Sequence, residues 1–279
     1  MQITTLIENK HTNDTLKAEH GLSLYIKTDS HNILFDTGQS NLFIQNAETL
    51  KIDLKEVDIV VISHAHYDHI GGLIDFLNLN TKAKVYLKKE IFDYQYVSIR
   101  ENVKKNIGFS KKLLTYKDRF VCLDTDILTF DNLYFIPNIN KIYPLPKGND
   151  ILYKQKYHTF YKDDFKHELI FAIKESNGIH LFSGCAHNGI LNMVSTVKET
   201  IDDVSIKTII GGFHLVAGNH FVKNETDQEI TIIAKELKKL ANGAHYYTGH
   251  CTSSSAFDKL SLTLGSDLQN LVMGHNIEV

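Results

Sequence analysis

The chain has 279 residues, of which 43% are hydrophobic and 23% are charged, and its formal net charge at pH 7 is −3. This composition is typical of a folded globular protein and excludes an intrinsically disordered chain. Because both signs of charge are interspersed, there is no electrostatic reason to expect nucleic acid or a membrane as a partner.

The number of cysteines and the N-terminal residues indicate the cellular compartment of the protein. The three cysteines, Cys122, Cys185 and Cys251, are too few and too scattered for a disulfide framework. No stretch approaches about 18 apolar residues, and residues 1–21 lack the basic and apolar regions of a signal peptide. We therefore expect a cytoplasmic protein. Its length suits a single domain over residues 1–279, and homo-oligomer formation stays open.

The first third of the chain alternates predicted strands and helices. Residues 1–9 are predicted as a strand, and 21–28 with 32–38 as a hairpin. Helical spacing follows at 39–50, and the β-branched run VDIVVIS at 57–63 is typical of a strand that is covered on both faces. After a Gly pair, helical spacing returns over the end of HIGGLIDFLNL, and AKVYLKKEIF is predicted as a strand and then a helix.

The middle of the chain, around residues 92–165, is predicted as a variable insert or lid. Residues 92–118 show no clean period, residues 120–139 indicate two or three short strands, and residues 140–165 indicate a long loop. The aromatic and basic side chains of this region suit either a lid that neutralises a phosphate or a solvated helical face, and we favour the helical face. They are Tyr94, Tyr96, Arg100, Lys104, Lys105, Phe109, Lys111 and Lys112.

Regular patterns return in the last 110 or so residues. Strands are predicted in HELIFAIKES, GIHLFSGCAH, SIKTIIGGFHL and HYYTGHCTS, and helices over 190–201 and 227–241. The last three of these strands end in turns that carry a histidine. The order of strand, histidine turn and helix therefore occurs in both halves of the chain.

One cluster carries the chemistry: His64, His66, Asp68 and His69 fall within six positions at a strand end. Residues two apart in an extended segment point to the same side, so His64 and His66 can approach one metal ion. Asp68 and His69 lie across the turn and suit a second ion. Imidazole with carboxylate favours zinc, and also manganese or iron. The alternative is a surface turn whose histidines pair with carboxylates.

The run SHAHYDHIGG resembles the H-x-H-x-D-H signature of the metallo-β-lactamase fold, and LFDTG with Asp36 precedes it. Within that superfamily, the chain is similar to the 7,8-dihydropterin-6-methyl-4-(β-D-ribofuranosyl)-aminobenzene-5′-phosphate synthase-like group. This closer similarity lies in IEN, AEHGLSL, ILFDTG, GCAHNGILN, GGFHL and TGHCTS, which span nearly the whole chain. The resemblance implies an α/β fold, a four-layer αβ/βα sandwich of two packed mixed sheets flanked by helices.

The resemblance also implies the site. It gives the first metal ion His64, His66 and His187, with His167 as the reserve candidate, and the second ion Asp68, His69 and His250. Cys185 stands where many relatives carry a bridging Asp, so it either bridges the metals or lies beside them.

The remaining candidates have supporting roles. Asp36 is expected to orient a ligating imidazole by accepting its second N–H. His20 and His214 are expected to contact substrate or donate a proton, or else to be structural. Cys122 and Cys251 are expected to lie in the core or beside the site without chemistry of their own.

The implied activity is that of a dinuclear metal-dependent hydrolase. A hydroxide shared by two divalent metal ions would attack the substrate, and Asp68 would orient it. The expected substrate is a phosphate ester or cyclic phosphate of a small pterin- or nucleotide-like molecule. Alternatives are a lactone or thioester hydrolase, an iron-dependent redox enzyme, and a non-catalytic sensor that binds a ligand at the metal site.

Overall fold

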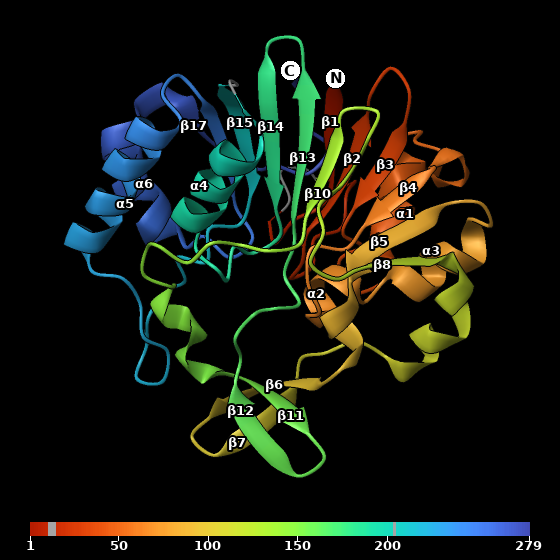
Figure 1. The fold of residues 1–279 in the computed structure, drawn as a ribbon, viewed down its shortest axis with the longest axis horizontal. Coiled ribbons are helices and arrows are strands. Elements are labelled where there is room, and N and C mark those ends of the chain that lie inside the picture. The colour runs from red at the N-terminus through yellow and green to blue at the C-terminus, as the bar shows by residue number, and fades with distance from the viewer. Residues whose placement is uncertain (11–14, 203–204) are drawn as a thin grey trace.

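Two seven-stranded mixed sheets pack face to face, and helices cover both outer surfaces (Figure 1). The computed structural model describes residues 1–10, 15–202 and 205–279. Helices α4, α5 and α6 cover one sheet, and α1 and α3 cover the other. The order of layers is helix, sheet, sheet, helix, so the predicted four-layer sandwich is confirmed.

The first sheet has the strand order β18, β1, β2, β3, β4, β5, β8. Strands β1 to β3 are antiparallel neighbours, whereas β3, β4, β5 and β8 run parallel. The predicted hairpin is present as β2 and β3. The elements of this half are β1 Gln2–Ile7, β2 Ser23–Lys27, β3 Asn32–Phe35, α1 Leu42–Thr49, η1 Leu54–Glu56, β4 Ile59–Val61, α2 Tyr67–Ile70, α3 Leu73–Leu79, β5 Lys84–Lys88, η2 Lys89–Phe92, β8 Phe120–Leu123 and β18 Asn276–Glu278.

The second sheet has the order β17, β16, β15, β14, β13, β10, β9. Strands β14 to β17 run parallel, and β13 and β10 are antiparallel to their neighbours. Its elements are β9 Leu128–Phe130, β10 Leu133–Ile136, β13 Ile170–Glu175, β14 Gly178–Ser183, α4 Ile190–Thr200, β15 Ile206–Gly211, α5 Asp227–Leu240, β16 His245–Thr248, α6 Ser254–Leu264, η5 Gly265–Asp267 and β17 Leu268–Asn270. No helix within the described ranges is long and apolar enough to cross a membrane.

Three hydrophobic clusters hold the layers together. One lies between the two sheets and is rich in phenylalanine, including Phe35, Phe135, Phe171 and Phe182. The other two lie between each sheet and its helices. Burial of apolar surface at about 25 cal/mol per Å² makes these three interfaces the main source of stability.

A third, four-stranded sheet lies below the sandwich, in the order β12, β11, β6, β7 (Figure 1). Its strands are β6 Gln95–Arg100, β7 Val103–Asn106, β11 Leu152–Lys156 and β12 Thr159–Lys162. The helical face favoured for residues 92–118 is therefore wrong, since two strands and the 3₁₀ helix η3 Lys111–Arg119 occupy it. The long loop predicted for 140–165 is also wrong, because η4 Lys147–Ile151 and a β-hairpin occur there.

Asn192 of α4 holds the segment around Ile142 and Tyr143, through which the chain leads from β10 back to the four-stranded sheet. Its side chain is fully buried, and Nδ2 donates to the carbonyls of Tyr143 (3.0 Å) and Asn188 (2.7 Å). Oδ1 accepts from the backbone N–H groups of Ile142 (2.9 Å) and Tyr143 (2.7 Å). Four backbone groups thus depend on one amide.

We expect Asn192→Leu to lower the free energy of unfolding by about 2–4 kcal/mol, because it leaves buried backbone groups unpaired at similar side-chain volume. Urea denaturation followed by circular dichroism measures the change. The exposed Asn270→Leu is the control, and its stability should stay within about 0.5 kcal/mol of the parent. Equal stability of the two variants would contradict the role of Asn192.

Candidate metal centre

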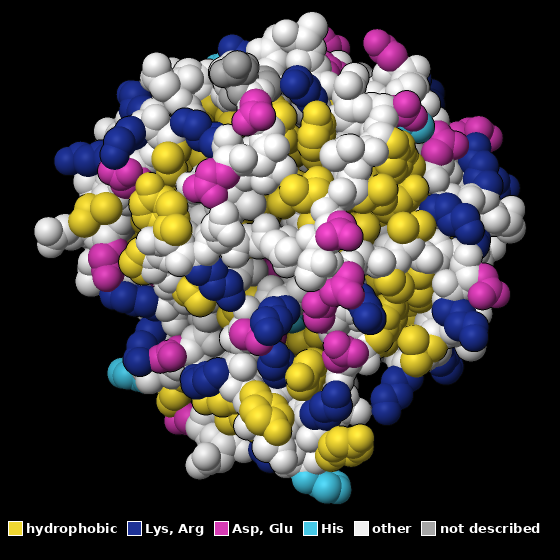
Figure 2. Space-filling view, viewed as in Figure 1, with side chains coloured by type: hydrophobic (Ala, Val, Ile, Leu, Met, Phe, Trp, Pro, Cys, Tyr) yellow, Lys and Arg dark blue, Asp and Glu magenta, His cyan; other side chains and the backbone are white. Residues whose placement is uncertain are grey.

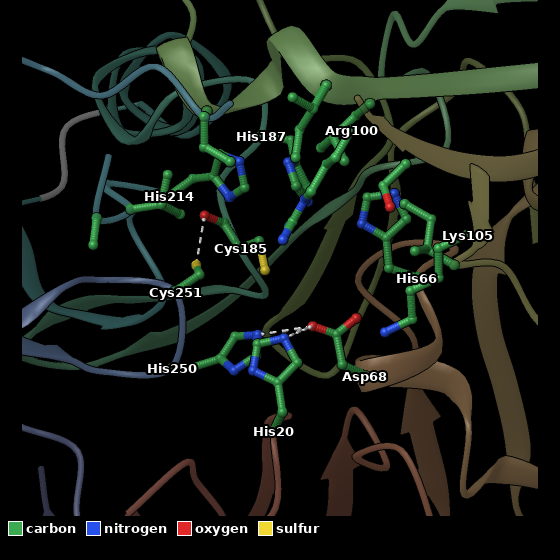
Figure 3. A pocket seen from close by; sticks show the side chains of 18 of the residues that line it. His20, His66, Asp68, Arg100, Lys105, Cys185, His187, His214, His250 and Cys251 are labelled. Carbon is green, nitrogen blue, oxygen red and sulfur yellow. Dashed lines mark hydrogen bonds and ion pairs between the residues drawn. The ribbon is translucent and has the colours of Figure 1, made fainter. Parts of the chain in front are cut away.

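The candidate ligands follow strands whose carboxyl ends meet at one edge of the sandwich. His64 and His66 follow β4 of the first sheet, while His187 and His250 follow β14 and β16 of the second. A cavity of about 560 Å³ opens there, and Figure 3 shows His66, Asp68, Cys185, His187 and His250 around it. The structure therefore brings together residues that are far apart in the sequence.

Two glycines allow the strand ends to approach this closely. A Cβ atom at Gly184 would lie 2.1 Å from Ser63 Oγ, and one at Gly212 would lie 2.2 Å from Cys251 Sγ. Both distances are far below van der Waals contact. The turns are also unusual at His214 and His250, whose φ angles are 50° and 43°, a region that costs non-glycine residues energy.

His64, His66 and His187 form the first group. Their ring centroids are 4.7 Å (His64 to His66), 4.9 Å (His64 to His187) and 4.7 Å (His66 to His187) apart. The Nε2 atom of each ring is buried and has no hydrogen-bond partner within the described ranges. Buried polar atoms are rarely left unpaired, so three such atoms in one place indicate a missing ligand.

Hydrogen bonds on the opposite side of two of these rings define their tautomers. Ser63 Oγ–H donates to Asp36 Oδ2 (2.7 Å), so Ser63 Oγ accepts from His64 Nδ1–H at 2.9 Å. Asn149 Nδ2 donates to the His187 carbonyl (2.8 Å), and Asn149 Oδ1 accepts from His187 Nδ1–H at 3.0 Å. The proton is thus held on Nδ1, and Nε2 presents its lone pair to the centre.

Asp68, His69, Cys185 and His250 form the second group, with ligand atoms all within 4.8 Å of one another. The Nε2 atom of His69 lies 3.0 Å from His250 Nε2 and 3.2 Å from Cys185 Sγ. Asp68 Oδ2 lies 3.2 Å from His250 Nε2 and 3.7 Å from His69 Nε2. Four different donor atoms therefore face one point.

The same support is present behind this group. His69 Nδ1–H donates to Asp36 Oδ2 at 2.6 Å, which is the role that we expect for Asp36 from the sequence. His250 Nδ1–H donates to Asn9 Oδ1 at 3.0 Å, and Asn9 Nδ2 donates to the His250 carbonyl at 2.7 Å. With both Nδ1 protons engaged, the two Nε2 atoms face each other at 3.0 Å, an arrangement that needs either a proton on one of them or a metal ion beside both.

Burial controls the charge of these side chains. It lowers the pKa of His64 and His187 well below the usual value, and that of His66 to about 3. Burial also lowers the pKa of His69, but the carboxylates of Asp36 and Asp68 outweigh this effect and raise it to about 9. Three of the imidazoles are therefore neutral ligands, and at His69 a metal ion would replace a proton.

Cys185 lies between the two groups. Its sulfur is close to His69 and also falls within 4.8 Å of the ligand atoms of His64 and His187. Burial raises the pKa of the Cys185 thiol, so the thiolate needs an adjacent cation. Cys251 lies beside Cys185 and His214 at the edge of the cavity, whereas Cys122 is exposed, so the predicted buried position of Cys122 is wrong.

His20 and His214 both line the cavity. The His20 side chain is 53% exposed, and its Nε2 lies 3.2 Å from Asp68 Oδ2. His214 is buried, its ring centroid is 4.1 Å from that of His187, and neither of its ring nitrogens has a hydrogen-bond partner in the described part of the chain. Both histidines are placed where they can contact a substrate.

The reserve candidate His167 uses both of its ring nitrogens. Its Nδ1 accepts from the Ala65 N–H at 3.2 Å, and Nε2–H donates to Asp163 at 3.1 Å. Its ring packs against that of His66, with centroids 5.4 Å apart. His167 therefore supports the loop of the first two histidines, and His187 provides the free nitrogen.

Four supporting residues were missed by sequence reasoning. Asn9 and Asn149 hold His250 and His187, as described above. The buried carboxylate of Glu8 accepts the backbone N–H of His250, and that of Glu168 accepts those of His187 and Asn188, both at 2.8 Å. Glu8 and Asn9 lie in the IEN motif, which was a usable signal, whereas Asn149 lies in a segment without any pattern.

Comparison with known proteins agrees with this geometry. The family model described as the metallo-beta-lactamase superfamily matches residues 16–103. The chain shares 30% sequence identity with Tm1679, whose crystal structure is described as that of a metal-dependent hydrolase of the beta-lactamase superfamily. The two structures superpose with a TM-score of 0.84. That alignment covers 100% of this chain and 99% of Tm1679.

Two further relatives are more distant. A protein of Methanocaldococcus jannaschii named 7,8-dihydropterin-6-methyl-4-(beta-D-ribofuranosyl)-aminobenzene-5′-phosphate synthase is 27% identical, with 100% of this chain and 96% of the relative aligned. The solved structure of a diphosphatase from the PhnP family is 15% identical, with a TM-score of 0.54 over 100% of this chain and 96% of that chain, and shows a shared fold alone. The sequence signature, the sandwich and the full-length similarity to Tm1679 together establish that this chain belongs to the metallo-β-lactamase superfamily.

Proposed function

We propose that the protein is a dinuclear metal-dependent hydrolase of a small phosphorylated molecule. One observation carries this proposal: buried imidazole Nε2 atoms converge in two groups on either side of Cys185, and those of His64, His66 and His187 have no hydrogen-bond partner within the described ranges. A single structural histidine needs no such arrangement. A pair of cations would satisfy both groups.

The residues divide between the two ions as the family resemblance implies. His64, His66 and His187 would hold the first ion, and Asp68, His69 and His250 would hold the second, with Cys185 as the shared ligand. Zinc suits this set of nitrogen, sulfur and carboxylate donors best, and manganese or iron are the alternatives. Two such cations supply, when bound, a nucleophilic water at neutral pH and positive charge for the oxygen under attack.

The protein's own residues would position and protonate the reactants. Burial raises the pKa of a carboxyl group, but His69 and the hydrogen bonds from His20 and His250 hold the pKa of Asp68 well below its usual range. Asp68 is therefore a carboxylate that can accept a hydrogen bond from the attacking water. His20 stands at the mouth of the cavity, where its imidazole can donate a proton to the leaving group. His214 would contact the substrate from the other side of the cavity.

The size of the cavity supports a small substrate. About 560 Å³ suits a molecule of nucleotide or pterin size and is too small for a folded macromolecule. A phosphate ester or cyclic phosphate would place its negative charge against the two cations. The name of the archaeal relative, which contains both a pterin and a 5′-phosphate, supports this substrate class.

A second candidate is bond formation, as in the synthase named for that relative, and the alignment over the whole chain favours it. The residues of the candidate metal centre would then hold a pterin that carries a phosphate leaving group, and this phosphate would depart as the bond to an aromatic partner forms. Mass spectrometry of products formed with and without the partner distinguishes a joined product from a hydrolysed one.

We expect the purified protein to contain about two equivalents of zinc or manganese by plasma mass spectrometry. His64→Ala and His250→Ala should each lose about one equivalent, because each removes one ligand of a different ion. The exposed His158→Ala is the control and should keep both. Mostly iron would favour the redox alternative, and no metal after reconstitution would contradict the proposal.

We expect Asp68→Ala to reduce metal-dependent hydrolysis of bis(p-nitrophenyl) phosphate by about 100-fold or more, since it removes both a ligand and the acceptor for the attacking water. Initial rates with saturating metal measure the effect. Asp75→Ala, on the exposed face of α3, should keep the parent rate. Full activity of the Asp68 variant would exclude this mechanism.

We expect Asn9→Ala and Asn149→Ala to weaken metal binding by about 10–100-fold while leaving all ligands in place, because each variant loses the acceptor that orients one imidazole. Competition with a chromophoric chelator gives the affinities. Asn9→Ala should affect the ion held by His250, and Asn149→Ala the ion held by His187. If both variants bind metal as the parent does, the asparagines do not orient the ligands.

A further inference from the structure

The four-stranded sheet presents one face to the metal centre. Tyr96, Ser98 and Arg100 alternate on β6, so their side chains share that face. The Tyr96 ring packs against His66, with centroids 6.1 Å apart, while Ser98 and Arg100 line the cavity. Lys105 on β7 pairs directly with Ser98 and also lines the cavity.

Two cationic side chains on this face lack carboxylate partners. No Asp or Glu of the described residues lies within ion-pair distance of Arg100 or Lys105, and Lys105 Nζ lies 3.4 Å from the Tyr67 hydroxyl and 5.1 Å from the centroid of its ring. On the same sheet, Lys154 is paired with Asp164 at 2.5 Å and Lys162 with Asp150 at 3.7 Å, whereas Lys104 and Lys156 lie over aromatic rings. Figure 3 shows Arg100 and Lys105 extending into the space beside Asp68 and Cys185.

Apolar side chains line the cavity next to these polar ones. Ile151 ends η4, Leu152 begins β11 opposite Ser98, and Val216 and Val222 come from the segment between β15 and α5. Figure 2 shows Lys and Arg side chains interspersed with hydrophobic ones over the lower part of the molecule, where this sheet lies. The cavity is thus lined by candidate metal ligands, by the cationic side chains of Arg100 and Lys105, and by apolar side chains.

We propose that Arg100, Lys105 and Ser98 form a second anion-binding subsite, which holds a phosphate group on the substrate remote from the bond that is broken. Two positive charges and a hydroxyl complement a phosphate dianion, and the guanidinium can bind two of its oxygens at once. A carboxylate would satisfy only one of the two charges. The proposal rests on the proposed function insofar as the reacting group lies at the metal centre.

Such a subsite defines the class of substrate. The molecule carries one group that reacts at the metal ions, a body that packs on Ile151 and Leu152, and a terminal phosphate that does not react. Binding energy from the remote phosphate would orient the reacting group over the ions.

The sheet also provides a matched control. Lys104 precedes Lys105 on β7 and has the same charge, but it faces the opposite side, where its Nζ lies 4.0 Å above the Phe160 ring. If positive charge anywhere on this strand strengthens phosphate binding, loss of either lysine should weaken binding equally. If the subsite is responsible, only loss of Lys105 should weaken it.

The test is a calorimetric titration of the metal-loaded protein with alkanediol bisphosphates from ethane to hexane, each compared with its monophosphate. In the parent and in Lys104→Ala, at least one bisphosphate should bind about tenfold or more tightly than its monophosphate. This gain should vanish in Arg100→Ala and Lys105→Ala and be partly retained in Arg100→Lys. Replacing the terminal phosphate with a carboxylate should reduce it.

Several outcomes would overturn the subsite: no gain at any chain length, an unchanged gain in Arg100→Ala and Lys105→Ala, or an equal loss in Lys104→Ala. An equal gain from the carboxylate probes would overturn the assignment to a phosphate dianion. Because the readout is binding, a protein that fails to hydrolyse phosphodiesters can still show the gain. If the protein hydrolyses phosphodiesters but binds no bisphosphate more tightly than its monophosphate, only the subsite proposal is contradicted, and the proposed function stands.

Discussion

The candidate metal centre depends on the hydrogen bonds that hold four of its five imidazoles, those of His64, His69, His187 and His250, from behind. Asp36 accepts from His69 and also receives the hydroxyl of Ser63, which in turn accepts from His64. One carboxylate thereby orients one histidine of each candidate ligand group. The backbone conformations, the glycine turns and the packing of the two sheets all serve to bring these rings to one edge, and their buried Nε2 atoms are stable there only with a cation nearby.

The two histidines that follow strands of the second sheet, His187 and His250, are held by the same pattern of hydrogen bonds. An asparagine receives the ring N–H and returns a hydrogen bond to the same residue's carbonyl, once at His250 and once at His187. A buried glutamate, Glu8 or Glu168, accepts the backbone N–H of each. Each ligand is thus fixed at its ring and at its backbone, which limits the rearrangement that metal binding requires.

The sandwich could be predicted from the sequence because its strands are short apolar runs followed by turns with clear chemistry. Strands β4 and β14 and helix α5 carry strong local patterns. The insert could not be predicted, since β7 reads VKKN and is exposed throughout, and β6 pairs with β11 far along the chain. Helix α6 was missed because its buried side, Ala256, Leu260 and Leu264, is narrow, although Ser253 caps its first turn.

Among the site residues, the ligands had a recognisable motif but their supports did not. Asn149 interacts with His187 through pairing between distant segments, which no local pattern records. The cavity face of β6 and β7 was equally hidden: Arg100 and Lys105 were noted as basic residues of the insert, but only the strand alternation shows that they share a face and that Lys104 does not.

The pairing of β6 with β11 also bears on how the protein folds. Ser98 lies opposite Leu152, and the chain between them first contributes β8 to one main sheet and β9 and β10 to the other. Closing so long a loop costs entropy that only prior formation of both sheets reduces. We therefore expect the insert to assemble after the sandwich and to open before it, as a separate cooperative unit. The insert, which carries the proposed anion subsite, would then be able to change in sequence, or to fluctuate, without disturbing the candidate metal ligands of the sandwich.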